Sequence, residues 1–298
     1  MTRVLFGVGE GLENGAQFKL IGDAFDSRER SVANGFFLTS LALGPAIVSP
    51  LAALALEHVG WRGLFLLFTL PGFLMAVVLF LFLPRSSRAG ASRVEHVGQD
   101  WRSIIAYAPA WGVALAYFGF NIAFWGLLGW LPTYLATERH LDLHALGIAS
   151  AIPYLAGFAG LLTIGWLGKS LLYRVRPLLI AATYALAALG LVATFRANTT
   201  AWSVAGLSIA AFFLYGGFGP FWAIVLDLAP KKIRGAFSGF VNFAGQIGGF
   251  IAPIVVGHIV AATHTFTNGF MFMIAGLALA VVAILPVKHR VVTEFGTE

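Results

Sequence analysis

Residues 107–136 read YAPAWGVALAYFGFNIAFWGLLGWLPTYLA and contain no charged side chain. A bilayer core about 30 Å thick is crossed by roughly 20 apolar residues in a helix, so this run is long enough to cross it. Its apolar residues do not alternate with polar ones as they would in an outer-membrane β-strand. We therefore predict a membrane-spanning α-helix, because a helix pairs all of its own backbone polar groups in lipid.

The composition extends this prediction to the whole chain. Of the 298 residues, 59% are hydrophobic and only 11% are charged, and the mean hydropathy is +0.85. These values lie outside the range of soluble globular domains. Similar apolar runs recur along the chain and predict an all-α, polytopic membrane protein with about nine transmembrane helices. The other eight are expected at residues 3–22, 31–56, 61–83, 146–167, 177–195, 202–226, 235–262 and 268–287.

The basic residues are distributed by connection. A net charge of +6 could suggest a nucleic-acid partner, but alternate connections are rich in Arg and Lys, as in residues 84–103. The intervening connections hold only Arg62, Arg139 and Arg196. By the positive-inside rule the rich connections face the cytoplasm. The charge is thus a topology signal, and no nucleic-acid partner is expected. It predicts a multi-pass protein of a bacterial inner membrane whose C-terminus, residues 288–298, is cytoplasmic.

Two loop-and-helix units follow one template. They begin at residues 23–30 and 227–234, an offset of 227 − 23 = 204 positions, and the offset persists where Gly44 maps onto Gly248. Six predicted helices separate the units, which is the pattern of a transporter built from two similar six-helix halves. The second half has six predicted helices but the first has three. We therefore expect an N-terminally truncated form of a twelve-helix protein.

The repeat also predicts the domain organisation. Residues 1–83 are expected to be the remainder of an N-terminal bundle, and the polar stretch 84–104 a cytoplasmic linker between the halves. Residues 105–287 are expected to form a C-terminal six-helix bundle, followed by the cytoplasmic tail 288–298. Transporters with such repeats bind their substrate between the halves near the bilayer midplane. Candidate functional residues are therefore polar side chains predicted at that depth.

The first predicted helix carries two charged residues on one face. Arg3 and Glu10 lie seven positions apart, which is about two helical turns. A charge at mid-bilayer costs on the order of 2.5–3.5 kcal/mol, so such residues are retained where they meet a cavity or a partner. Burial favours the neutral form of Glu10, whereas Arg3 or an incoming cation favours its carboxylate. We interpret Glu10 as a proton-coupling site; a static ion pair is an equally good interpretation of these residues alone.

A second candidate site is a stripe on the predicted helix 107–136. Tyr117, Asn121 and Trp125 follow at i, i+4 and i+8 and so share one helix face. For Tyr117 and Asn121 we favour cavity lining over packing, because an amide is costly against lipid. For Trp125 the two interpretations are equally good.

The later half adds three candidates. Trp222 follows the glycine-rich stretch 216–220, which is expected to loosen or kink its helix. Asn242 and Gln246, again at i and i+4, lie among glycines whose expected role is close helix packing. The two amides could bind a solute or bond across helices. The sequence contains no metal-ligand cluster, phosphate-binding loop or nucleophile motif, so we expect transport without a cofactor and not an enzyme.

At these residues the chain resembles the anion:cation symporter family of the major facilitator superfamily, which includes bacterial sugar-acid and aromatic-acid permeases. RVLFGVGEG at residues 3–11 is similar to the arginine-to-glutamate signature of the family's fourth helix, and WLPTYL at 130–135 is similar to its seventh. Trp222, Asp227 and the glycine-rich series 242–253 resemble helices ten and eleven. The resemblance covers the whole chain, as helices 4 to 12 of twelve.

The resemblance implies a secondary active transporter that carries a small organic anion together with H⁺ by alternating access. It implies that Glu10 is the protonation site, with Arg3 as its partner, and that Trp222 and Asn242 face the substrate. The expected partners are a small carboxylate and the lipid bilayer, and the expected state is a monomer. A membrane solute sensor that does not transport, or an inactive fragment of a transporter, are the alternatives.

Three departures from the family pattern bear on the substrate and on gating. The arginine that clamps the substrate in the family lies on its first helix, which is not among the nine helices expected here. Some sugar-acid members have glutamine at the positions of Leu41 and Tyr117, so an aromatic or less polar acid is also a candidate substrate. An acidic residue is usual in the loop after the eighth helix, where this chain has Gly-Lys-Ser at residues 168–170.

Overall fold

The computed structural model describes residues 30–82, 104–105, 107–169, 175–228 and 234–287, and within these ranges the secondary structure is helical. Each main helix is long and apolar enough to cross a membrane. This confirms the prediction of an all-α, multi-pass protein. The helices are α2 (Arg30–Phe82), α4 (Ala108–Thr137), α5 (Leu143–Lys169), α6 (Arg176–Arg196), α7 (Thr200–Leu228), α8 (Arg234–Thr263) and α9 (Thr267–Ile284).

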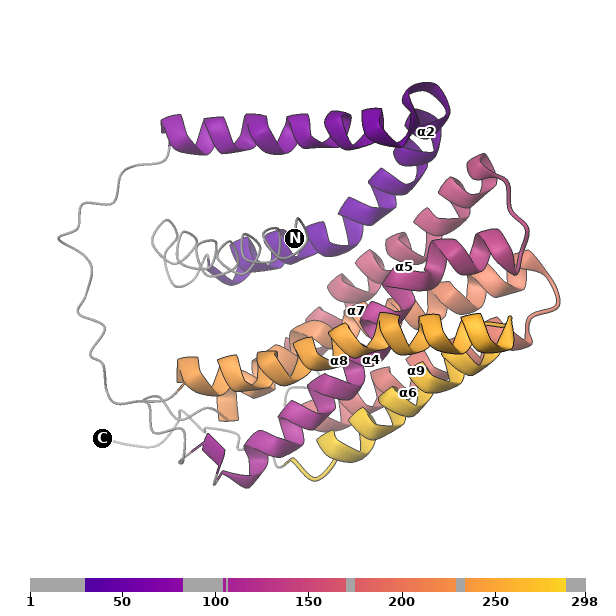
Figure 1. The fold of residues 1–298 in the computed structure, drawn as a ribbon. Coiled ribbons are helices and arrows are strands. Elements are labelled where there is room, and N and C mark those ends of the chain that lie inside the picture. Colours follow the sequence, from indigo (N-terminus) through magenta and orange to yellow (C-terminus); the bar gives the residue numbers. More distant parts are fainter. Residues whose placement is uncertain (1–29, 83–103, 106, 170–174, 229–233, 288–298) are drawn as a thin grey trace.

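The helix count differs from the predicted nine, since the described residues contain seven candidate spans. The expected spans 31–56 and 61–83 are one element, α2, which is interrupted at Gly60 with φ 63° and ψ 177°. Glycine adopts a positive φ at little cost because it has no Cβ. The chain therefore bends at this residue without a loop, and Figure 1 shows the two arms of α2 meeting there. The expected span 3–22 lies outside the described residues, and the truncation stays an expectation.

The six spans expected after residue 104 correspond to α4–α9, with boundaries shifted by a few residues. In this group α4 packs on α8 and α9, α5 packs on α7, and α6 packs on α7 and α9. Glycines lie at close crossings: Gly119 of α4 lies against the Gly276 carbonyl of α9, and Gly160 of α5 against the Phe212 carbonyl of α7. Small residues at such crossings let helix backbones approach, which favours helix association in lipid.

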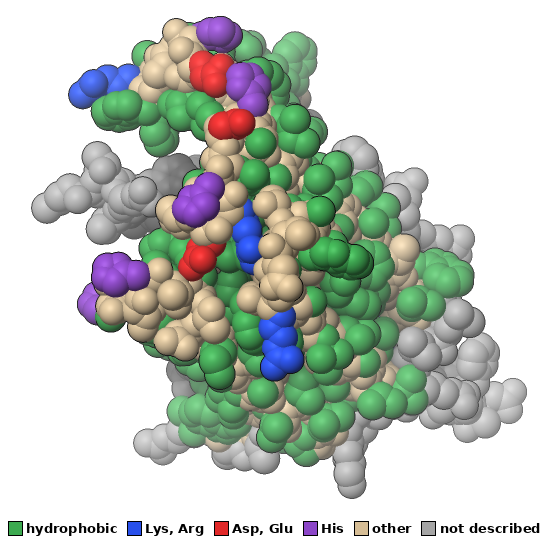
Figure 2. Space-filling view, turned by 90° about the vertical axis from the view of Figure 1, so that its right-hand side faces the viewer, with side chains coloured by type: hydrophobic (Ala, Val, Ile, Leu, Met, Phe, Trp, Pro, Cys, Tyr) green, Lys and Arg blue, Asp and Glu red, His purple; other side chains and the backbone are tan. Residues whose placement is uncertain are grey.

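The surface of the described residues suits a lipid environment. Figure 2 looks onto the end of the molecule where α2 bends: charged and histidine side chains gather in a band along its left and centre, and hydrophobic side chains cover much of the rest. Along the second arm of α2, large side chains such as Phe65, Phe73 and Phe80 are exposed. Soluble monomers rarely expose apolar surface on this scale.

Candidate functional site

Tyr117 and Trp222, two of the predicted substrate residues, are in contact. The Tyr117 ring stacks on Phe221 of α7 with 4.9 Å between ring centroids, and it meets the Trp222 ring edge-on at 5.3 Å. The amide nitrogen of Asn121 donates a 2.8 Å hydrogen bond to the main-chain oxygen of Tyr117. The structure therefore brings Tyr117, Asn121 and Trp222 together from two helices that are far apart in the sequence.

This contact extends into a wall of aromatic rings across α4, α6 and α7. Phe120 stacks on Tyr117 at 5.8 Å and on Tyr184 of α6 at 5.3 Å. Phe124, the next ring along α4, stacks on Phe120 at 5.4 Å and meets Tyr215 of α7 edge-on at 5.0 Å. Stacked and edge-on contacts at these distances stabilise ring pairs beyond the apolar area that they bury. The wall is thus continuous from Trp222 to Tyr215.

The glycines of α8 pack on the same stripe of α4. Gly245 lies against the Tyr117 ring and the Asn121 amide, and Gly249 lies against the indole of Trp125. A side chain at either position would collide with these groups, which agrees with the packing role predicted for the glycines. Because α8 covers the stripe, Tyr117 and Asn121 are only 4% and 2% exposed. In this structure they are buried between helices.

Other predicted site residues lie at the surface of the described helices. Trp125 is 41% exposed, Trp222 is half-buried, and Asn242 and Gln246 of α8 are exposed. An exposed amide at membrane depth is costly unless it meets water, a solute or another helix. Direct contact of these side chains with a solute stays a prediction. Arg3 and Glu10 lie outside the described residues.

The described residues place no carboxyl group in the middle of a membrane helix. Their acidic side chains are Glu57 beside the bend of α2, Glu138 and Asp142 in the α4–α5 connection, and Asp227 in the last turn of α7. Any proton-binding carboxyl at mid-membrane must therefore come from a part of the chain outside the described ranges. The predicted position of Glu10 is in such a part.

Arg139 organises one end of α4–α9, a role that the sequence reasoning missed because it treated Arg139 as a topology signal. Its Nε and Nη2 donate to the Tyr134 hydroxyl at 3.0 and 2.9 Å, and Nη2 also donates to the Ala197 carbonyl at 2.9 Å. The Tyr134 hydroxyl lies 2.6 Å from Oγ of Ser203 in α7. The last carbonyls of a helix lack helical donors and favour a nearby cation. Arg139 thus caps α6 and joins it to α4 and α7.

Replacing Arg139 with Gln is expected to lower the free energy of unfolding by about 1–3 kcal/mol, since several hydrogen bonds from a charged donor are lost. Thermal unfolding in detergent, followed by circular dichroism, measures the change. The matched control is Arg196→Gln, because Arg196 is an exposed arginine at the same end of the molecule. Equal losses in the two variants would contradict the capping role of Arg139.

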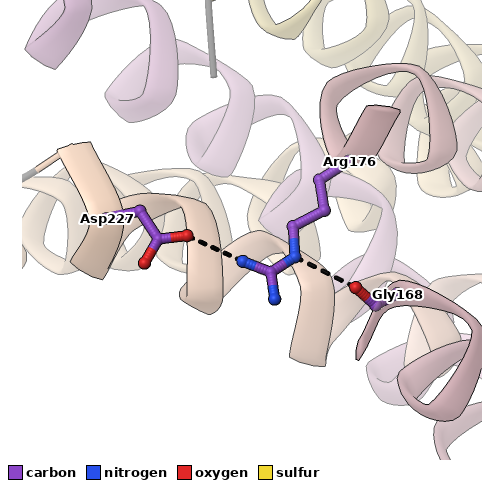
Figure 3. A network of polar contacts seen from close by, with 3 residues as sticks. All are labelled: Gly168, Arg176 and Asp227. Carbon is purple, nitrogen blue, oxygen red and sulfur yellow. Dashed lines mark hydrogen bonds and ion pairs between the residues drawn. The ribbon is translucent and has the colours of Figure 1, made fainter. Parts of the chain in front are cut away.

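A second arginine fastens the opposite end of α6. Arg176, at the first residue of α6, is buried, and its Nη1 donates to Oδ2 of Asp227 at 2.7 Å. Its Nε donates to the Gly168 carbonyl at 3.1 Å. Figure 3 shows the guanidinium group between these two partners, which lie near the ends of α5 and α7. Buried charges are retained when they are paired and hydrogen-bonded, so Arg176 ties three helices together.

The sequence of the chain matches the model of the Major Facilitator Superfamily over residues 1–253. It is 29% identical over 288 residues to the "Probable L-galactonate transporter" of Escherichia coli (strain K12), covering 89% of this chain and 63% of that protein. It is 29% identical over 300 residues to the "Hexuronate transporter" of Bacillus subtilis (strain 168), covering 94% and 70%. It is 27% identical over 309 residues to the "Probable sulfoacetate transporter SauU" of Cupriavidus necator, covering 95% and 70%. The chain thus spans about two thirds of the length of these relatives.

The fold is similar to a solved structure of a bacterial homolog of the human lysosomal transporter Spinster, in an inward-facing and unoccupied conformation. The TM-score is 0.64 at 15% sequence identity, and the match covers 91% of this chain and 71% of the other. At this identity the likeness concerns the fold alone.

Proposed function

Because the chain belongs to the Major Facilitator Superfamily, we propose that it acts in a secondary active transporter that carries a small organic anion across a bacterial inner membrane by alternating access. The observation that carries this proposal is the similarity along most of the chain to proteins named as transporters of galactonate, hexuronate and sulfoacetate. These three solutes are small organic acids that are ionised at neutral pH, so a common anionic substrate class is the simplest extension to this chain.

The side chains of α4–α9 indicate which part of the substrate these helices can bind. At mid-membrane the described residues of α4–α9 offer aromatic rings and amides, from Trp125 and Trp222 to Asn242 and Gln246, and no cationic side chain. Groups of this kind bind the hydroxyl and apolar parts of a solute and give it orientation. We therefore assign the uncharged part of the substrate to these residues. A cationic partner for its carboxylate is expected outside the described ranges.

We also propose H⁺ as the coupling ion and Glu10 as the group that carries it. The acidic residues of the described ranges all lie at helix ends or at the bend of α2, whereas Glu10 is predicted inside a helix. A carboxyl near a cavity at mid-membrane can change its charge as the cavity opens to either side. The Arg3 guanidinium would favour the ionised form once the proton has left.

The orientation of the protein in the membrane is proposed from the distribution of its basic residues. The Arg-rich stretch 84–103 and the tail 288–298 are assigned to the cytoplasm. The bend at Gly60 and the Arg139 cap then face the outer side, and the Arg176–Asp227 pair lies at the cytoplasmic side.

Uptake by the purified protein in liposomes tests the function. Galactonate, galacturonate and sulfoacetate are the first substrates to measure, with benzoate as the aromatic alternative. Trp222→Ala is expected to raise the KM for the carried acid roughly tenfold, since a half-buried indole in a binding wall contributes on the order of 1–2 kcal/mol. Asn242→Ala is expected to raise the KM by a factor of about 2–10 through one lost hydrogen bond.

The matched control for Trp222 is Trp202→Ala, an exposed tryptophan at the other end of α7, which is expected to leave KM unchanged. A protein that moves none of these acids would contradict the proposed function. Uptake with the same increase in KM for Trp202→Ala and Trp222→Ala would contradict the site while leaving the function in place.

A further inference from the structure

The first arm of α2 meets the group α4–α9 mainly at α5. Close to the bend, the Glu57 carboxylate lies 3.1 Å from Nδ1 of His144 at the start of α5. About one helical turn further along α5, a Cβ added to Gly147 would lie 2.8 Å from Cβ of Ala53 and 3.1 Å from Cα of Pro50. The two helices are therefore in close backbone contact here.

A third contact joins α7 to a main-chain carbonyl of α2 that has no hydrogen-bond donor within its own helix. Pro45 lies inside α2, and a proline has no N–H to donate to the carbonyl four residues earlier, which is that of Leu41. The Tyr215 hydroxyl of α7 donates a 3.2 Å hydrogen bond to this Leu41 oxygen. A backbone carbonyl without a partner is costly at membrane depth, so the tyrosine supplies the missing donor.

Tyr215 is held in place by α4 and α5. Its ring is buried, meets Phe124 edge-on at 5.0 Å and lies directly against Gly157 of α5. The ring belongs to the aromatic wall that reaches Trp222. Its hydroxyl therefore extends from the candidate substrate wall to the backbone of α2.

The three contacts lie along one stretch of α2. From Leu41 to Glu57 a helix rises about 24 Å. The contact between α2 and the group α4–α9, here called the joint, therefore runs over much of a membrane thickness and ends near the bend. Figure 1 shows the first arm of α2 close to α5 on the side of the bend and farther from the other helices at its opposite end.

We propose that the Tyr215 hydroxyl and the Leu41 carbonyl form a lock that holds the first arm of α2 against the group α4–α9. The proposal rests on the proposed function in one respect, namely that α2 and the group α4–α9 separate along this contact during transport. The lock breaks when α2 moves away, and both groups then need water as their partner. The Glu57–His144 pair, with side chains 37% and 59% exposed, contributes little in comparison because water screens it. Tyr215 is a positioning residue in this scheme, since it holds α2 and does not need to contact the solute.

A cysteine reporter tests the lock without any knowledge of the solute. The 298 residues contain no cysteine, so Ala53→Cys introduces a single thiol, buried opposite Gly147. Adding Tyr215→Phe removes only the hydroxyl and is expected to speed the reaction of this thiol with a water-soluble maleimide roughly threefold to tenfold. Gly147→Leu inserts a side chain between α5 and α2, so the maleimide reaction rate in this variant serves as the reference for separated helices. Asn198→Cys, exposed at the same end within α4–α9, is the control reporter and is expected to react at the same rate with or without Tyr215→Phe.

The role of the freed carbonyl is tested by restoring its helical partner. Pro45→Ala returns an N–H that can bond to the Leu41 oxygen, so Tyr215→Phe is then expected to change the rate by less than about twofold. This non-additivity separates the lock from a general loosening of the fold, which would give the same increase in both backgrounds. The proposal is overturned if Tyr215→Phe leaves the Ala53→Cys rate unchanged, or if its effect persists undiminished beside Pro45→Ala. A protein that shows the lock but carries no acid would contradict the proposed function alone.

Discussion

Replacing Glu10 with Gln is expected to abolish the accumulation of substrate that a pH gradient drives. Glutamine has nearly the same shape as glutamic acid but cannot bind and release a proton, so the solute gradient loses its link to the proton gradient. One pH unit corresponds to about 1.4 kcal/mol per proton, so accumulation should fall by roughly tenfold for each unit of the imposed gradient. Uptake into liposomes with an acidic exterior measures the change. Exchange of labelled for unlabelled substrate is expected to continue, because it needs no net proton movement.

The matched control for this experiment is Glu13→Gln. Glu13 lies three residues further along the same predicted helix, on the side of Glu10 nearer the connection that begins at Asp23, where a carboxyl can reach the aqueous interface. Accumulation is expected to survive in this variant. Full accumulation in Glu10→Gln, or an equal loss in the two variants, would remove Glu10 from the coupling mechanism while leaving the substrate class untouched.

Replacing Asp227 with Ala is expected to lower the free energy of unfolding by about 2–4 kcal/mol, because it leaves the buried Arg176 guanidinium without its carboxylate. The loss is expected to be smaller than for a fully buried pair, since the Asp227 side chain is 34% exposed. Chemical unfolding in detergent measures it. The affected region is the end where α5, α6 and α7 meet, so the other predicted sites should keep their structure.

A double variant separates the effect of the lost carboxylate from a general loss of packing. Arg176→Met combined with Asp227→Leu removes both charges and keeps much of the volume, so it should be more stable than Asp227→Ala alone. Part of the loss should remain, because the Gly168 carbonyl still loses the donor that Arg176 provides. A double variant as unstable as the sum of the two single changes would contradict the ion-pair explanation.

Helix positions were predictable because lipid leaves the backbone few choices. The charge-free run at residues 107–136 had to become a helix that satisfies its own polar groups, and α4 covers Ala108–Thr137. The break near residue 60 was also visible, between two apolar runs. The sequence did not show that Gly60 alone makes the bend, because a helical pattern on both sides is compatible with a loop or with a single non-helical residue.

The candidate site was predictable only up to one helix at a time. Periodicity placed Tyr117 and Asn121 on one face of α4, and this follows from the helix geometry itself. That Gly245 of α8 covers both residues, and that Trp222 meets the Tyr117 ring, depends on how three helices cross. Crossing is decided by side-chain shape at contacts distant in the sequence, and no local pattern contains that information.

The sequence by itself determined the membrane class, the helical architecture and the residues that carry charge, because hydrophobicity and helix period are local properties. Only the tertiary structure decided which partners those residues have. Pro45 predicts a carbonyl in need of a donor at Leu41, yet the donor is Tyr215, 174 positions away. Arg139 and Arg176 acquire their roles in the same way, from carbonyls and hydroxyls or a carboxylate that lie near them only when the helices are packed together.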